Sequence, residues 1–487
     1  MSLIIALVAL VIAGRFILKK YNPQGVLFTT GIVLMVIAIF MQDASFVKKS
    51  TGFIGFDIFE YISATFSNRG GGLGLKIMLI GGFAMLMSAI GASQVMVRVA
   101  AKPLTKLHSP YLMLALAFML GQFLSLFISS ATGLGLLLMA TLYPVLVNLG
   151  CSRASVAAVL ASTCAVEMGP GSGNSILAAK TAGLDITEYF VNDQLPITIP
   201  TIIAIAVVHA FTQRYFDKKG ATEAAIDTPE NDVKQDETTA PLYYVLLPIL
   251  PLFLMLTFSK IGVDDIRVGM STAIIISVAI SLVCEFIRCR DGKAVFEKLQ
   301  GVFGDMGKIF ATVVTLIIAG QTFATGLKSI GAIDAMIELA TRFGFSAAVI
   351  VLIMALLTFS ISALMGSGNA AFFSFAPTVP QIAKTIGIDV SSMILPIQMS
   401  AGMGRTISPI AGVIIAVSSM AGLSPFDVVR RTLLPMLSGW LFMLAITFGG
   451  SGHLLDILPF LLGMIALAGV IFLYRKSKSD KLVAKEV

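Results

Sequence analysis

Two long stretches of this 487-residue chain contain no charged side chain, and they restrict it to a membrane-embedded helical fold. No Asp, Glu, Lys or Arg occurs between Lys106 and Arg153, and none occurs between Arg342 and Lys384. Soluble domains do not tolerate such runs, because about a quarter of their residues are charged. Here the charged fraction is 13% and the mean hydropathy is +0.93, so the sequence predicts an all-α polytopic membrane protein.

About eleven apolar segments are long enough to cross roughly 30 Å of hydrocarbon. They lie near 3–18, 25–41, 73–91, 154–184, 195–213, 242–259, 268–287, 308–327, 390–421, 432–449 and 457–474. The two uncharged runs stand apart, because small polar residues interrupt them at 129–135 ("SSATGLG") and 365–372 ("MGSGNAAF"). Each run is either two spans with a loop or a re-entrant hairpin, over 107–150 and 343–386.

The loop charges predict how the chain lies in the membrane. With a periplasmic N-terminus and a cytoplasmic C-terminus, most Lys and Arg clusters face the cytoplasm, as the positive-inside rule requires, with Lys48 and Lys49 as the main exceptions. The first apolar run lacks a cleavage site, so we expect a retained helix. The net charge of +7 sits in short loops beside anionic lipid and gives no reason to expect a nucleic acid partner.

The chain also contains an internal repeat with a shift of about 240 residues. "FAMLMSAIGA" at 83–92 matches "FATGLKSIGA" at 323–332, "GLG" at 133–135 falls on "GSG" at 366–368, and "PGSG" at 170–173 falls on "PIAG" at 409–412. An odd number of crossings per copy makes the repeat inverted, which is typical of secondary transporters. The predicted parts are a first repeat (1–216) with a broken helix at 154–184, a cytoplasmic linker (217–240), a second repeat (241–450) with a broken helix at 390–421, and an extra C-terminal helix and tail (451–487).

Arg405 is the only charged side chain between Asp389 and Asp427. A charge at mid-membrane costs at least about 2.5 kcal/mol, so this side chain should face protein or water and have a partner. Unwound backbone that lines a cavity is predicted around it by Gly402, Gly404, Ser408, Pro409 and Gly412. The guanidinium is either half of an interhelical ion pair or, as we expect, a bidentate anchor for a substrate carboxylate.

Glu167 is likewise the sole charge between Arg153 and Lys180, in the stretch "EMGPGSGNS". The repeat places it opposite Thr406, one position from Arg405, so the two charges are expected to meet. Three interpretations are open: a resting-state partner of Arg405, a protonatable coupling group, or an acceptor for a substrate ammonium.

The interruptions in the uncharged runs supply hydroxyls, an amide and bare backbone N–H groups. If they are hairpin tips, half-helix N-termini would direct partial positive charge at an anion and unwound carbonyls could hold a cation. The alternative is close helix packing through small residues. The residues concerned are Ser129, Ser130, Thr132 and Gly133 at the first tip, and Gly366, Ser367, Gly368 and Asn369 at the second.

Other chemistry lacks its motifs in this sequence. The three histidines do not cluster, so no metal site is expected, and no G-x-x-x-x-G-K-[ST] loop supports an ATP-driven pump. We expect neither an enzyme nor a cofactor. A membrane enzyme or an anion channel is the competing class.

Several motifs give the chain a resemblance to the DcuC-type anaerobic C4-dicarboxylate transporters of the ion-transporter superfamily. They are "NRGGGLGLKIMLIGGF", "SPYLMLALAF", "SSATGLGLLLMATLYPV", "GSGNAAFF", "GRTISPIAGV" and "SPFDVV". The resemblance implies carriage of succinate, fumarate or malate across the bacterial inner membrane, as succinate efflux or exchange, by symport or antiport. It also implies a homodimer whose scaffold domains hold mobile transport domains that move as elevators.

The family's hairpin tips carry Ser-Asn-Thr-like motifs that touch substrate and sodium. Here the first tip has Ser130 and Thr132 without the asparagine, and the second has Ser367 and Asn369 without the threonine, so the sodium motif is incomplete. The coupling ion, proton or sodium, is left open. With Arg405, the tips are expected to form the substrate cage together with Ser172, Asn174, Thr406 and Ser408. A zwitterionic dicarboxylate such as aspartate, or a different organic anion, is the alternative cargo, because Glu167 lies beside Arg405.

Overall fold

The computed structural model describes residues 2–449 except 20, 42–44, 48, 108, 221–239, 260–262, 264, 333–334, 336–337 and 339–344. All regular elements in these residues are helices. The predicted C-terminal segment 451–487, with its span at 457–474, and most of the predicted linker lie outside the described residues.

Seven helices in the described part are long and apolar enough to cross a membrane. They are Pro23–Met41, Ile54–Ala89, Ile186–Lys218, Met270–Cys289, Gly292–Ser329, Ala347–Met365 and Pro425–Gly449. Three run well beyond the predicted spans, because polar residues such as Glu60 and Glu297 lie on helical faces and do not end the helix. The protein is a multi-pass membrane protein.

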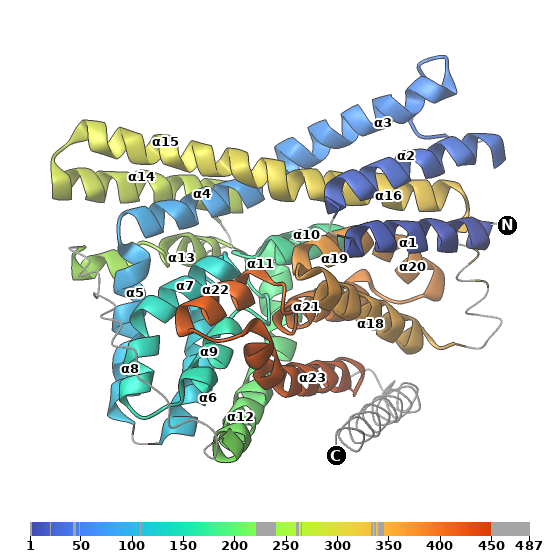
Figure 1. Ribbon diagram of the computed structural model, residues 1–487. Coiled ribbons are helices and arrows are strands. Elements are labelled where there is room, and N and C mark those ends of the chain that lie inside the picture. Colours follow the sequence, from blue (N-terminus) through green and yellow to red (C-terminus); the bar gives the residue numbers. More distant parts are fainter. Residues whose placement is uncertain are drawn as a thin grey trace, which may run out of the picture.

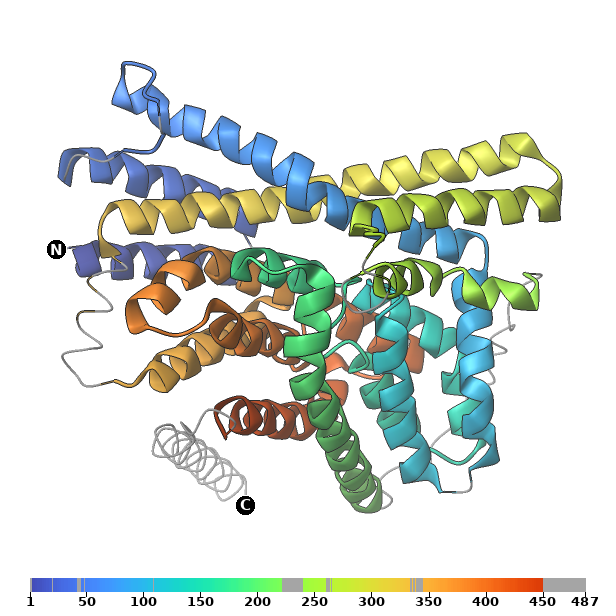
Figure 2. The same ribbon diagram turned by 180° about the vertical axis from the view of Figure 1, so that it is seen from behind.

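A layer of long helices lies along one side of the molecule (Figures 1 and 2). It contains α2 (Pro23–Met41), α3 (Ile54–Asn68), α4 (Leu75–Ala89), α14 (Met270–Cys289), α15 (Gly292–Ile309) and α16 (Thr315–Ser329). Two π-helical turns, η1 (Arg69–Gly74) and η5 (Phe310–Val314), continue α3 into α4 and α15 into α16, and they pack against each other. Helix α1 (Ser2–Leu18) packs on α2, whereas α5 (Ala92–Ala101) and η2 (Lys102–Lys106) run from the end of α4 away from the layer (Figure 1).

The block beneath this layer contains two helical hairpins and two interrupted helices (Figure 1). The first set is α6 (Pro110–Ser125), α7 (Ala131–Thr141), α8 (Tyr143–Asn148), α9 (Arg153–Ala161) and α10 (Gly173–Ala182). The second is α18 (Ala347–Met365), α19 (Gly368–Phe375), η6 (Ala376–Thr378), α20 (Val379–Ile386), α21 (Val390–Thr406) and α22 (Gly412–Ala421). The interrupted helices break at 162–172 and 407–411, which places polar backbone inside the block.

The break near Arg405 begins later than the sequence predicted. Gly402 and Gly404 lie inside α21, and their role is close packing. A Cβ atom would meet the carbonyl oxygen of Ala165 at 2.4 Å at Gly402, and that of Phe359 at 2.2 Å at Gly404. The glycines therefore let neighbouring backbone approach α21, and they do not unwind it.

The two halves repeat the same order of elements, and helix starts mark equivalent positions. Gly173 and Gly412, which the repeat superimposes, are the first residues of α10 and α22. The tips correspond at Ser130 and Ser367, because each is the N-cap of the helix that follows, and not at the matched "GLG" and "GSG" triplets.

A pair of helices joins the halves at the far side of the block. Helix α12 (Leu195–Gly220), which follows α11 (Ile186–Glu188) and η3 (Tyr189–Gln194), packs along α23 (Pro425–Gly449). Its end at Gly220 lies inside the predicted linker, and Asp217 there accepts from Arg431 Nη1 at 2.7 Å. The second half begins with η4 (Leu242–Leu246) and α13 (Leu250–Thr257).

Candidate functional site

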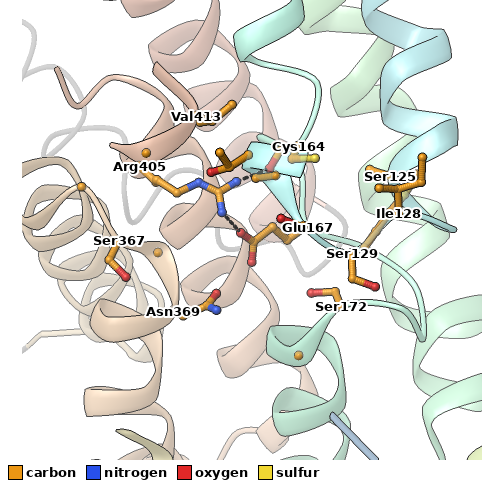
Figure 3. A pocket seen from close by; sticks show the side chains of 18 residues that line it. Ser125, Ile128, Ser129, Cys164, Glu167, Ser172, Ser367, Asn369, Arg405 and Val413 are labelled. Carbon is orange, nitrogen blue, oxygen red and sulfur yellow. Dashed lines mark hydrogen bonds and ion pairs between the residues drawn. The ribbon is translucent and has the colours of Figure 1, made fainter. Parts of the chain in front are cut away.

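A cavity of about 270 Å³ lies between the two hairpin tips and the two helix breaks (Figure 3). Both halves of the chain contribute to its wall. The lining residues are Ser125, Ile128, Ser129, Ser130, Ala131, Thr132, Cys164, Glu167, Met168, Ser172, Gly173, Gly366, Ser367, Gly368, Asn369, Arg405, Gly412 and Val413.

Four helix N-termini meet at this cavity, because the first residues of α7, α10, α19 and α22 all line it. Three of these helices have a serine N-cap, in which the hydroxyl oxygen accepts a backbone N–H. Ser130 accepts from Gly133 at 3.1 Å, Ser172 from Ser175 at 3.4 Å, and Ser367 from Ala370 at 3.3 Å. Helix N-termini carry partial positive charge and free N–H groups, so the cavity is suited to an anion.

Arg405 is the only Lys or Arg among the residues that line the cavity (Figure 3). It lies in the last turn of α21, and its side chain is 13% exposed. Nη1 donates to Glu167 Oε1 at 2.6 Å, and Nη2 donates to the carbonyl oxygen of Cys164 at 2.7 Å. Nε is buried and has no hydrogen-bond partner.

Glu167 takes up one donor of the Arg405 guanidinium. Its side chain is 11% exposed, and its second carboxylate oxygen accepts from the amide nitrogen of Asn174. Glu167 and Arg405 are therefore in contact, as the repeat predicted. In this structure one protein anion neutralises the cavity's cation.

A buried polar network fixes the backbone on which Glu167 lies. Gln398 donates to the Glu167 carbonyl oxygen at 2.7 Å and to Ser175 Oγ at 3.0 Å. Gln194 donates to Ser175 Oγ at 3.0 Å and accepts from Gly169 N at 2.9 Å. Both glutamines are fully buried, so they hold the break after α9 against α21 and η3.

Most of the predicted cage residues lie on the cavity wall, but four do not. Thr406 Oγ1 bonds back to the Gly402 carbonyl oxygen, and Ser408 is fully buried with an unpartnered hydroxyl. Gly133 lies in the first turn of α7 beyond the lining residues, and Asn174 is buried behind Glu167. Asn174 thus positions Glu167 and does not face the cavity.

Several residues of the cavity were not predicted from the sequence. Cys164 supplies a carbonyl oxygen to Arg405, and Ser125, Ile128, Met168 and Val413 line the wall. No sequence signal marks these residues, because apolar or small side chains like theirs are common throughout the helices. Gln194 and Gln398 could have been found, since a glutamine in an apolar helix needs a buried partner.

The chain matches known transporters in its sequence. A family model described as "DcuC: C4-dicarboxylate anaerobic carrier" matches residues 1–451. The anaerobic C4-dicarboxylate transporter DcuC of Escherichia coli K12 is 39% identical over 448 residues, which cover 92% of this chain and 96% of that protein. A probable transporter of the same name from Vibrio cholerae serotype O1 is 38% identical over 443 residues, covering 90% and 95%.

Two solved structures share the fold at low sequence identity. Neisseria gonorrhoeae MtrF, described as illuminating a class of antimetabolite efflux pumps, has a TM-score of 0.58 and 13% identity, covering 87% of this chain and 95% of that one. The YdaH transporter of Alcanivorax borkumensis has a TM-score of 0.58 and 15% identity, covering 88% and 99%. The family and its relatives are transporters and not enzymes.

Proposed function

Because this chain belongs to the DcuC family of C4-dicarboxylate anaerobic carriers, we propose that it is a secondary transporter of succinate, fumarate or malate that binds them in the cavity at Arg405. One observation carries the assignment of the site: a buried guanidinium lies in the same cavity as four helix N-termini. The guanidinium and the partial positive charges of the helix N-termini can together neutralise a bound dianion.

Arg405 anchors one carboxylate of the substrate, and the helix N-termini receive the other. The planar guanidinium presents donors in a fixed fork, which a carboxylate accepts in two parallel hydrogen bonds. The tips at Ser130 and Ser367 lie on opposite hairpins, so a substrate between them touches both halves of the chain. The serine caps hold these N-termini in place.

Glu167 acts as an internal substitute for the substrate carboxylate and as the coupling group. A dianion that takes Arg405 must displace Glu167, and an unpaired carboxylate beside a dianion is unfavourable. Glu167 therefore takes up a proton when substrate binds, and it returns to Arg405 when substrate leaves. The other charged or titratable groups on this side of the cavity are Arg405 and the thiol of Cys164.

Alternating access follows from an elevator movement, in which the block of hairpins and interrupted helices slides past the layer of long helices. The arrangement of a long-helix layer over a block of hairpins supports this division, as does the repeated order of elements in the two halves. We place the protein in the inner membrane as a homodimer, with a periplasmic N-terminus. Succinate efflux or exchange is the direction that the family's anaerobic role favours.

The test is counterflow of labelled succinate into proteoliposomes that contain purified wild type, Arg405→Lys or Glu167→Gln. Wild type is expected to exchange succinate for fumarate and malate, and Arg405→Lys to lose at least about 99% of the rate, because a lysine cannot form the paired hydrogen bonds. Undiminished counterflow by Arg405→Lys would remove the anchor. Imposed proton and sodium gradients then identify the coupling ion, and Glu167→Gln is expected to keep exchange while losing the response to the proton gradient.

A zwitterionic substrate such as aspartate is a second candidate, because the Glu167 carboxylate lies within the same cavity and could accept an ammonium group. Competition separates the two. A dicarboxylate carrier prefers succinate to aspartate, and Glu167→Gln leaves that preference in place. An aspartate carrier shows the reverse preference, and Glu167→Gln weakens aspartate most.

A further inference from the structure

A second cavity lies where the long-helix layer meets the block, and its wall is rich in cations. Its volume is about 180 Å³, and its charged lining residues are Arg69, Lys76, Lys180 and Asp185. The first two come from η1 and α4, and the other two from the end of α10 and the start of α11. Because η1 and α10 pack together, this cavity spans the boundary along which the proposed movement occurs.

Two of these cations lie far inside an apolar helix. Arg69 and Lys76 belong to the 36-residue candidate span Ile54–Ala89, where a charged side chain needs a functional or structural partner. Arg69 Nη2 donates to Gln321 Oε1 at 2.8 Å, which is a neutral acceptor. Within the described part of the chain, Arg69, Lys76 and Lys180 have no ion pair with an acid.

The charges in the wall do not balance. Three cations face one carboxylate, and Asp185 already accepts the backbone N–H of Thr187 at 2.8 Å as a helix cap. The cavity thus has an excess of two positive charges at neutral pH, which is the charge of a C4-dicarboxylate with the opposite sign. Arg405 in the central cavity is instead neutralised by Glu167.

The backbone of η1 leaves room beside these cations. The sequence Arg69–Gly74 forms a π-helical turn with three consecutive glycines, and Gly72 lines the cavity. A Cβ atom at Gly71 or Gly72 would meet nothing within 4 Å, so packing does not demand glycine there. Bare backbone next to a cationic wall instead allows a ligand to approach closely, and π-helical turns are frequent at functional sites.

We propose that this cavity is a second binding site for a small dianion, at the opposite end of α10 from the central cavity. The helix runs from Gly173, which lines the central cavity, to Ala182, next to Lys180 of the second one. Ten residues of helix span about 15 Å, so a dicarboxylate held there lies about one helix length from the wall of the central cavity. The identity of the ligand rests on the proposed function, whereas the existence of the site does not.

The test is equilibrium binding of labelled succinate to the full chain in phosphatidylcholine nanodiscs. Wild type is expected to bind about two succinates per chain. The double variant Lys76→Gln/Lys180→Gln and the single variant Arg405→Gln are each expected to bind about one. Adding the lysine changes to Arg405→Gln is expected to weaken its remaining binding at least about tenfold. Lys76→Arg/Lys180→Arg, which keeps the charges, is expected to bind like wild type.

Lys384→Gln is the matched control, because Lys384 is exposed in the last turn of α20 as Lys180 is in the last turn of α10. It should bind like wild type. If removing both lysines leaves the stoichiometry and affinity unchanged, the second site is overturned, whereas an unaffected Arg405→Gln overturns the central site alone.

A lipid phosphate has similar chemistry, so the measurement is repeated in nanodiscs that contain phosphatidylglycerol. Retention of both succinates supports a site for the free dianion. Loss of only the lysine-dependent succinate in these discs would assign the cavity to lipid headgroups and overturn the dicarboxylate assignment.

Discussion

In the part of the chain that the structure describes, two ion pairs join the first half to the second, and they have nearly the same geometry. Arg405–Glu167 measures 2.6 Å with side chains 13% and 11% exposed, and Arg431–Asp217 measures 2.7 Å with both side chains 14% exposed. Neither distance nor burial distinguishes them. Their surroundings do, and that difference separates a binding site from a structural clamp.

The Asp217 carboxylate is saturated by the protein. It accepts from Ser152 Oγ at 2.8 Å and from Ser155 Oγ at 2.9 Å as well as from Arg431, whose guanidinium also lies over the Phe216 ring. These groups do not line the central cavity. Arg405, in contrast, faces a cavity and keeps Nε without a partner. A guanidinium that lines open space can take a ligand, whereas one enclosed by protein groups cannot.

The largest expected effect separates the two pairs by transport. Arg405→Gln removes the substrate anchor and should reduce the counterflow rate of succinate at least about a hundredfold, a loss of roughly 2.7 kcal/mol in transition-state terms. Arg431→Gln is the matched control and should retain most of the rate per folded molecule. Equal losses in folded, monodisperse samples of both variants would mean that the two pairs serve the same purpose.

Exchanging the two charges within each pair should restore the structural pair but not the central one. Asp217→Arg with Arg431→Asp should recover about half or more of the stability lost in either single variant, because the hydroxyls of Ser152 and Ser155 can donate or accept. Glu167→Arg with Arg405→Glu should remain inactive, since the anchor then lies on the wrong wall. Counterflow and thermal unfolding of the four single and two double variants check this. Recovered succinate transport by the exchanged central pair would refute the anchor.

Stability should respond in the opposite sense to transport. Asp217→Asn leaves Arg431 without its counter-ion and should lower the free energy of unfolding by about 3 kcal/mol. Glu167→Gln should cost less, about 1 kcal/mol, because its cavity admits water to solvate Arg405. Unfolding of both variants in the same detergent measures the difference. A larger loss at Glu167 would make that pair the structural one.

The smallest effects concern the serine caps. Replacing Ser130, Ser172 or Ser367 by alanine should cost about 1 kcal/mol of local helix stability and weaken succinate binding a few-fold. Ser152→Ala removes the equivalent cap of α9, away from the cavity, and should lower stability without changing succinate affinity. Affinity that changes equally in all four would show that the caps act only through the fold.

Much of the site could be predicted from isolated charges. Arg405 and Glu167 are conspicuous in sequence because each is the single charge in a long apolar stretch, and the repeat placed them together. The serine tips were predicted for a related reason, since small polar residues interrupt apolar runs where backbone needs caps. Charge is costly in a membrane, so each exception carries information.

Other features depend on side-chain direction or on distant chain segments, which a single sequence does not encode. Thr406 and Ser408 lie one and three positions after Arg405, yet both are buried outside the cavity wall because the helix ends between them. Asp217 was predicted to lie in the linker. Its partner Arg431, which pairs with it near the end of α12, is far away in the chain. The cationic cavity was missed for the same reason, since Lys76 and Lys180 meet only in the fold.

The decisive measurement is a structure of the chain with bound succinate. We expect a succinate carboxylate within hydrogen-bond distance of the Arg405 guanidinium, with Glu167 turned away from it and the second carboxylate at the helix N-termini. An unbroken Arg405–Glu167 pair with succinate bound elsewhere would contradict it.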